Sequence, residues 1–312
     1  MKEKIIYELK TLYRDDMRAR AFEFGSGEES VCILGSLRGN EVQQTFVCSQ
    51  LVKELNILEK KGAIAADKKI TVIPCANPRS INTEKRFWPI DNTDINRMFP
   101  GYELGETTQR IAAGLFENIK NYKYGIQFTS FYMPGRFIPH VRMMSTGEED
   151  VEQAKFFGMP YVVRRKVRPY DTTTLNYNWQ LWETKAYSVY TSTTADIDES
   201  SAKQGIRSVL HFLKCIGVID ESVFTHAGYH SKLLWDTDMV NVRNTHSGIY
   251  RPVLQSGQQA EAGDLLAKIV DPYTGEITER IIAPCNGTIF FSHSNPLVYS
   301  STAVVKIVPE TV

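Results

Sequence analysis

A cation and a carboxylate, Arg38 and Glu41, stand three residues apart where an apolar run gives way to a helical pattern. The run, residues 31–34, has the length and composition of a buried strand, and it ends at Gly35. Side chains at a strand-to-helix turn lie over the carboxyl end of a sheet, where open α/β folds bind their ligands. We therefore expect Arg38 and Glu41 to belong to a ligand site.

A second polar segment follows in the loop that we expect over residues 76–105. It contains Arg86 and, at 94–101, the run Asp-Ile-Asn-Arg-Met-Phe-Pro-Gly. Loops of this length without regular structure usually carry function. The loop is therefore a second candidate for functional residues.

The turn and the loop together resemble the succinylglutamate desuccinylase/aspartoacylase family, a branch of the zinc carboxypeptidase superfamily. The turn at 35–41 is similar to the family's Gly-x-x-His-Gly-x-Glu motif, whose His and Glu bind zinc. The loop is similar to the family's Asn-Pro, Arg and Asp-Leu-Asn-Arg-x-Phe-Pro-Gly series, with Arg86 at the Arg. The resemblance implies that Glu41 occupies a zinc-ligand position and that Arg38 occupies the position of the first His.

In this family the Asn-Arg pair of the loop binds the carboxylate of an N-acylated amino acid or of a C-terminal residue. Here that pair is Asn96 and Arg97. An arginine pairs with a carboxylate through two parallel hydrogen bonds, and a neighbouring amide adds a directional donor. The resemblance therefore makes Asn96 and Arg97 candidate ligand-binding residues, the alternative being that they only hold the loop by bonding backbone carbonyls.

The other zinc-site residues of the family fall on different residue types in this chain. The family's second His ends the next strand in an Asp-Leu-His motif, and our alignment places Thr129 at this His. The register is supported by residues 139–142, which are similar to the family's Pro-x-Val-Arg and end at Arg142. The catalytic Glu lies in a late strand, and the alignment places Tyr190 at or near it.

These substitutions bear directly on the family's chemistry, which needs three zinc ligands, a metal-bound water and a Glu that carries its proton. A guanidinium has no lone pair to give a metal, and a Thr hydroxyl is a poor zinc ligand beside imidazole. Glu41 is the one ligand retained in this comparison. We therefore expect no cofactor and little or no hydrolysis.

Several interpretations of such a site stay open. In the first, the chain binds a carboxylated small molecule or a peptide C-terminus through the residues Arg38, Arg86, Asn96, Arg97 and Arg142. As an alternative to this first interpretation, Arg38 only neutralises Glu41 and the pocket no longer binds a ligand. In the second, the chain is an active metal-dependent hydrolase, an N-acyl amino acid deacylase or a carboxypeptidase-like enzyme, that holds zinc in an atypical site. In the third, it assembles with an active paralogue.

Periodic patterns predict the elements that position these residues. Apolar positions recur at three- and four-residue spacing in three predicted helices, and short apolar runs between them predict strands. This alternation predicts an α/β fold with a mostly parallel or mixed sheet flanked by helices, like that of zinc carboxypeptidases. Further along the chain, short apolar runs alternate with Gly, Pro and Asn, as in a small all-β, barrel-sandwich-like module. We expect domains at 1–222 and 223–312.

Composition narrows the class of partner. The 312 residues carry 36 basic and 36 acidic side chains, so no general electrostatic attraction to nucleic acid or to an anionic membrane is expected. No apolar run approaches the length of a membrane span, and residues 1–4 lead into no signal-peptide core. The five cysteines include no Cys-x-x-Cys motif, which favours free thiols and a cytoplasmic protein. A homo-oligomer is compatible with all of these observations.

Overall fold

The computed structural model describes residues 1–12, 15–220, 222 and 228–311. The chain divides into two compact units, which are residues 1–130 with 139–232 and residues 131–138 with 233–312. The domain boundary expected between residues 222 and 223 adjoins positions outside the described residues, so it stays a prediction. Within the described part of the chain, no helix combines the length and apolar composition that crossing a membrane requires.

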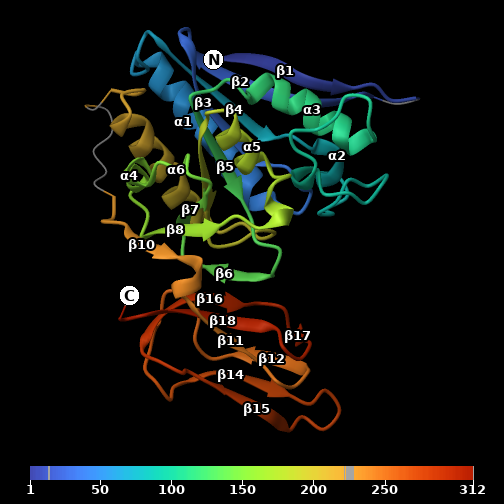
Figure 1. Cartoon of the computed structure of the whole chain (residues 1–312), viewed down its shortest axis with the longest axis vertical. Coiled ribbons are helices and arrows are strands. Elements are labelled where there is room, and N and C mark those ends of the chain that lie inside the picture. The colour runs from blue at the N-terminus through green and yellow to red at the C-terminus, as the bar shows by residue number, and fades with distance from the viewer. Residues whose placement is uncertain (13–14, 221, 223–227, 312) are drawn as a thin grey trace. The chain divides into compact units, whose positions relative to one another are not determined.

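The strands of the first unit form one mixed sheet in the order β1-β2-β4-β3-β5-β9-β7-β8 (Figure 1). Four strands at its centre, β4, β3, β5 and β9, are parallel, whereas β2 and β7 run antiparallel to their neighbours β4 and β9. This mixed α/β sheet confirms the predicted fold class. The bounds are β1 (Lys2–Leu9), β2 (Met17–Gly25), β3 (Glu28–Ser36), β4 (Lys68–Cys75), β5 (Tyr124–Thr129), β7 (His140–Ser145), β8 (Tyr161–Lys166) and β9 (Lys185–Tyr190).

Helices cover both faces of this sheet, as the alternating pattern predicted. On one face, α1 and α6 pack Leu51 and Phe212 into a buried cluster with Phe128 of the sheet. On the other face, α3 and α5 pack Leu115 and Trp179 into a second buried cluster. The bounds are α1 (Val42–Lys60), α2 (Pro78–Ile81), α3 (Thr107–Ile119), α4 (Val151–Ala154), α5 (Leu175–Leu181) and α6 (Glu199–Cys215).

The loop 76–105 is less irregular than the sequence indicated. It contains the short helix α2, whose first turn is capped by the Asn77 side chain accepting from the Ser80 backbone N–H at 3.1 Å. It also contains a 3-10 turn, Ile95–Arg97, capped by Asp94. Side-chain caps of this kind stabilise short helical turns that apolar periodicity does not reveal.

Three parallel strands deliver polar residues to one edge of the sheet. β3 ends at Ser36, and on the neighbouring strands Thr129 of β5 lies in register with Tyr190 of β9. Because parallel strands share a direction, their carboxyl ends meet at the same edge, where α/β folds bind ligands. The predicted site residues that follow β3 and those that end β5 and β9 therefore lie at the same edge of the sheet.

Gly125 of β5 lets α5 lie close to this part of the sheet. A Cβ atom at this position would lie 2.6 Å from Cε3 of Trp179, closer than packed atoms allow. The Trp179 ring is fully buried, and its Nε1 donates to the Ile119 carbonyl at 2.9 Å. The absence of a side chain at Gly125 thus fixes how close α5 comes to β5 and β9.

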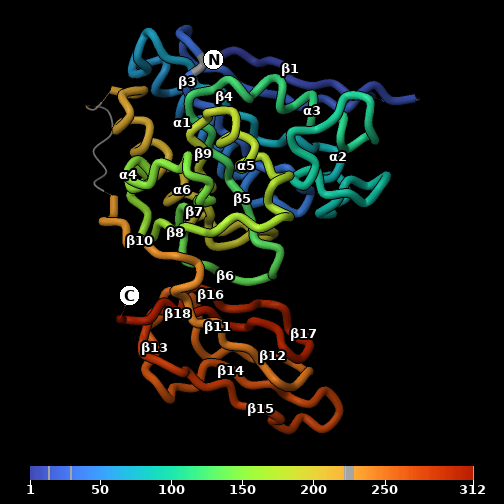
Figure 2. The backbone as a smooth tube through the Cα atoms, viewed as in Figure 1, coloured from blue at the N-terminus to red at the C-terminus, as the bar shows by residue number. Residues whose placement is uncertain are grey.

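The second unit contains two antiparallel sheets, whose backbone path can be followed in Figure 2. One has the order β11-β18-β16-β13 with β6 on β16, and the other has the order β15-β14-β12-β17. The apolar runs of the C-terminal pattern supply its core, including Leu266, Ile289 and Ile307. The bounds are β6 (Gly135–Phe137), β10 (Lys232–Trp235), β11 (Val240–Arg243), β12 (Gly248–Pro252), β13 (Gln259–Ala260), β14 (Leu265–Val270), β15 (Ile277–Ile282), β16 (Gly287–His293), β17 (Leu297–Val298) and β18 (Ala303–Pro309).

Candidate functional site

The turn after β3 places the Glu41 carboxylate among four hydrogen-bond donors. Oε2 accepts from the backbone N–H groups of Leu37 at 2.9 Å and Arg38 at 3.0 Å. Oε1 accepts from Ser130 Oγ at 2.7 Å and from Arg38 Nη1 at 3.0 Å. Glu41 is fully buried, so these donors replace the water that a carboxylate would otherwise bind.

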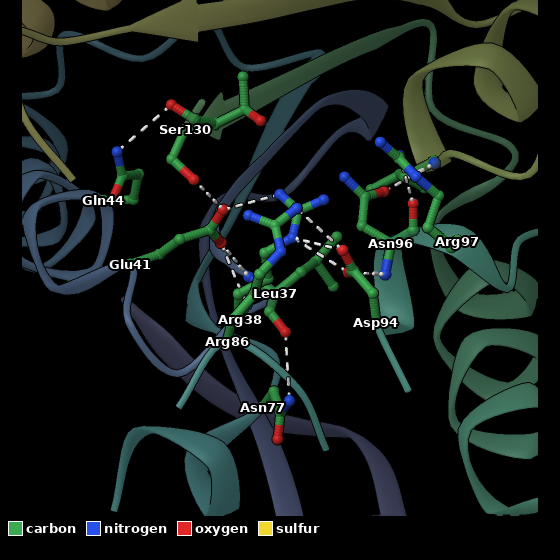
Figure 3. A network of polar contacts seen from close by, with 12 residues as sticks. Leu37, Arg38, Glu41, Gln44, Asn77, Arg86, Asp94, Asn96, Arg97 and Ser130 are labelled. Carbon is green, nitrogen blue, oxygen red and sulfur yellow. Dashed lines mark hydrogen bonds and ion pairs between the residues drawn. The ribbon is translucent and has the colours of Figure 1, made fainter. Parts of the chain in front are cut away.

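The Arg38 guanidinium lies between two carboxylates (Figure 3). Its Nε is 3.0 Å from both carboxylate oxygens of Asp94, while its Nη1 reaches Glu41. The side chain is only 3% exposed. Burial lowers the pKa of Arg38, but the charges of Glu41 and Asp94 outweigh it and raise the pKa above its ordinary value. Arg38 is therefore a permanent cation in the interior of the site.

Asp94 is shared by two arginines. Besides Arg38, Arg86 donates to it through Nη2 at 3.0 Å, and the Asn96 backbone N–H donates at 3.0 Å. Burial raises the pKa of Asp94, but the charges of Arg38 and Arg86 bring it below its ordinary value. Asp94 thus joins the loop to the turn.

Asn96 and Arg97 follow directly in the same loop. Asn96 Oδ1 accepts from the backbone N–H of Leu175, the first residue of α5, at 3.0 Å. None of the described residues accepts a hydrogen bond from Asn96 Nδ2. One end of this amide therefore holds the loop against α5, and its donor end is available to a ligand.

Arg97 is half-buried, and its Nη1 donates to the Asn96 carbonyl at 3.1 Å. Within the described residues it forms no ion pair. Burial lowers the pKa of Arg97, and the nearby charge of Arg38 lowers it further. Asp94 and Asp171 attract it from a distance, but no carboxylate of the described residues forms an ion pair with it.

Three further predicted residues lie on neighbouring strands. Thr129 ends β5 and directly precedes Ser130, which donates to Glu41. Tyr190 stacks on the His140 ring, with centroids 4.8 Å apart and an interplanar angle of 4°. Arg142 lies on β7 and is buried, 8% exposed. The structure therefore joins Arg38, Glu41, Arg86 and Asn96 directly, with Arg97 beside them.

Two members of the network were not predicted as site residues. Ser130 donates to Glu41 from the end of a strand, and Asp94 binds both Arg38 and Arg86. Asp94 is the first residue of the loop motif, which was a signal that it has a role. No sequence signal marked Ser130.

The donor set of this site does not fit zinc. In the described part of the chain, no group of three His, Cys, Asp or Glu side chains is placed to hold a metal ion. The retained carboxylate of Glu41 is already bonded to four donors, and one of them is a cation. Zinc sites in proteins use imidazole, thiolate and carboxylate ligands, whereas a guanidinium repels the ion.

Comparisons with known proteins point to one family. Residues 28–183 match the family model of the succinylglutamate desuccinylase/aspartoacylase catalytic domain. A solved succinylglutamate desuccinylase/aspartoacylase from Rhodobacter sphaeroides is 18% identical with a TM-score of 0.78, covering 98% of this chain and 95% of that chain. A succinylglutamate desuccinylase from Silicibacter sp. TM1040 is 17% identical with a TM-score of 0.82, covering 98% and 94%.

The product-bound ectoine utilization protein EutE from Ruegeria pomeroyi is 17% identical with a TM-score of 0.81, and the match covers 98% of this chain and 94% of that chain. A comparison with curated protein sequences gives no significant match. At these identities the structural likeness concerns the fold, which extends over nearly the whole chain.

The buried ion pairs predict a large cost for removing Arg38. In an Arg38→Met variant, Glu41 and Asp94 lose their buried counter-charge, so the free energy of unfolding should fall by about 3–5 kcal/mol in urea denaturation at pH 7. Arg86→Met is the matched control, because Arg86 is more exposed, at 22%, and should cost about 1 kcal/mol or less. Equal free energies of unfolding for the two variants would contradict the prediction that Arg38 stabilises the fold by pairing with Glu41 and Asp94.

The lowered pKa of Asp94 predicts a specific acid sensitivity. A carboxylate with a depressed folded-state pKa stabilises the fold fully above its unfolded pKa of about 4, and the contribution is lost as pH falls through the folded value. Unfolding free energy should therefore decline more steeply below pH 4 in the wild type than in Asp94→Asn. The exposed Asp91 lies in the same loop, and Asp91→Asn should keep the wild-type profile.

Proposed function

Since the chain belongs to the succinylglutamate desuccinylase/aspartoacylase family, we propose that it uses this fold to bind a carboxylated small molecule or a peptide C-terminus, with little or no hydrolysis. The observation that carries the proposal is the buried Arg38 guanidinium, held at 3.0 Å from both Glu41 and Asp94. It places a fixed positive charge where the family's motif has a zinc ligand.

The charge balance of the site supports anion binding. Arg38 and Arg86 pair with the two carboxylates Glu41 and Asp94, and Arg97 beside them brings the count to three positive charges against two negative ones. Burial lowers the pKa of both Arg86 and Arg97, and repulsion from Arg38 lowers it further. A bound carboxylate would relieve that repulsion, and it could also accept a hydrogen bond from Asn96 Nδ2.

The residues at the family's catalytic positions do not suit amide hydrolysis. Tyr190 stands at or near the position of the catalytic Glu, so the carboxylate that takes a proton from water in the family's mechanism is replaced there by a phenol. Glu41 has its carboxylate bonded to four donors, so it is poorly placed to act as a base. Binding without turnover is the function that this combination supports best.

Metal content separates this proposal from an active hydrolase. After zinc loading and dialysis, elemental analysis should find far less than one zinc per chain, because residues 1–12, 15–220, 222 and 228–311 contain no group of three metal ligands and Arg38 already binds Glu41. Glu41→Ala should leave the small amount of bound zinc unchanged. About one zinc per chain, lost in the Glu41→Ala variant, would instead favour a metal-dependent deacylase or carboxypeptidase-like enzyme.

Ligand binding tests the carboxylate site itself. We expect N-acetyl amino acids or short peptides with a free C-terminus to raise the melting temperature of the protein, because they bind only the folded state. Arg97→Glu should abolish the shift by reversing the charge of the arginine that forms no ion pair among the described residues. Arg207→Glu, a charge reversal at an exposed residue of α6, should keep it. Unchanged affinity in Arg97→Glu would overturn the anion site.

A further inference from the structure

A row of polar side chains crosses the sheet of the first unit beneath α5. Ser188 of β9 lies in register with Gln127 of β5 on one side and with Arg142 of β7 on the other. Residues in register on neighbouring strands point to the same face of a sheet. Gly125, two residues before Gln127, faces Trp179 of α5, so the row points toward that helix.

Helix α5 adds an amide to the row from above. Asn176 is 2% exposed, and its Nδ2 donates to Ser188 Oγ at 2.8 Å. This bond brings the Asn176 amide over the middle strand of the row, next to the position of Gln127. Three elements, β5, β9 and α5, therefore enclose one polar patch in an otherwise apolar layer.

Two atoms of this patch have no hydrogen-bond partner among the described residues. They are Gln127 Nε2, which is a donor, and Asn176 Oδ1, which is an acceptor. Gln127 is 1% exposed and Asn176 is 2% exposed, so bulk water does not satisfy them. Buried polar atoms are nearly always paired in folded proteins, so an unpaired donor and acceptor on neighbouring elements indicate a missing partner.

The patch is connected to the candidate carboxylate site. Asn96, in that site, accepts a hydrogen bond from the backbone of Leu175, and Asn176 is the next residue. Ser188 is half-buried although its strand lies between β5 and β7, so solvent reaches part of this residue. The residue bonded to Asn96 and the residue that carries the amide of the patch are thus consecutive on α5.

We propose that Gln127 and Asn176 bind a neutral amide group of the ligand, with Gln127 donating to its carbonyl oxygen and Asn176 accepting from its N–H. The inference rests on the proposed function and narrows its ligand to a carboxylic acid that also carries a carboxamide. Arg142 gives the row a positive charge, so charge alone would admit a second carboxylate. A carboxylate has no N–H, however, and would leave its oxygen facing Asn176 Oδ1.

The test compares acid and amide forms of the same ligand by calorimetry on the wild-type chain. The pairs are N-acetylaspartate with N-acetylasparagine and N-acetylglutamate with N-acetylglutamine, and N-acetylglycine probes the carboxylate site alone. The amide of at least one pair should bind at least about tenfold more tightly than its acid. Gln127→Met and Asn176→Leu should each reduce this preference to about twofold or less, since they remove one hydrogen-bonding group.

Gln204→Met on α6 is the matched control, and it should keep the preference because α6 covers the other face of the sheet. If the acids bind as tightly as the amides while N-acetylglycine binds, the amide subsite is wrong and the carboxylate site stands. If none of the five compounds binds, both proposals are overturned. A preference that persists in both Gln127→Met and Asn176→Leu would also overturn the amide subsite.

Discussion

A guanidinium buried between two carboxylates is the interaction on which the rest of the site depends. Arg38 is 3% exposed, yet it carries a full charge, which Glu41 and Asp94 balance. Buried charges are tolerated when they are paired and hydrogen-bonded on all sides, and this requirement ties together segments distant in sequence. The turn after β3, the loop before α3 and the end of β5 are all held by the same few atoms.

The same loop is held to the neighbouring helix by a single amide. Asn96 accepts from the first backbone N–H of α5, and α5 lies close to the sheet because Gly125 has no side chain to oppose Trp179. The position of the Asn96 loop at the carboxyl edge of the sheet therefore depends on how Trp179 of α5 packs against Gly125. The polar patch of Gln127 and Asn176 belongs to this connection, since it joins the helix to the strands beneath it.

Local spacing was sufficient to predict part of this arrangement. Apolar periodicity predicted the long helices. The pairing of Arg38 with Glu41 was a hypothesis drawn from the place of Arg38 at a zinc-ligand position, and the structure shows this ion pair. Bonds between distant segments were beyond such reasoning: Ser130 lies 89 residues from Glu41, and Asp94 lies 56 residues from Arg38. The contacts of Ser130 with Glu41 and of Asp94 with Arg38 follow from the order of the strands and the path of the loop, which local sequence patterns do not reveal. For the same reason, the pairing of β6 with β16 was not predicted.

The cation at the centre of this site, the Arg38 guanidinium, is part of the polypeptide. Each chain therefore contains one such cation. Every folded molecule carries one Arg38 guanidinium, because the residue is synthesised with the chain and stays protonated over the whole physiological pH range. Its occupancy therefore does not depend on metal supply, on chelators or on competition among divalent ions. The charge of Glu41 and Asp94 is therefore balanced at this edge of the sheet by a group that metal starvation cannot remove.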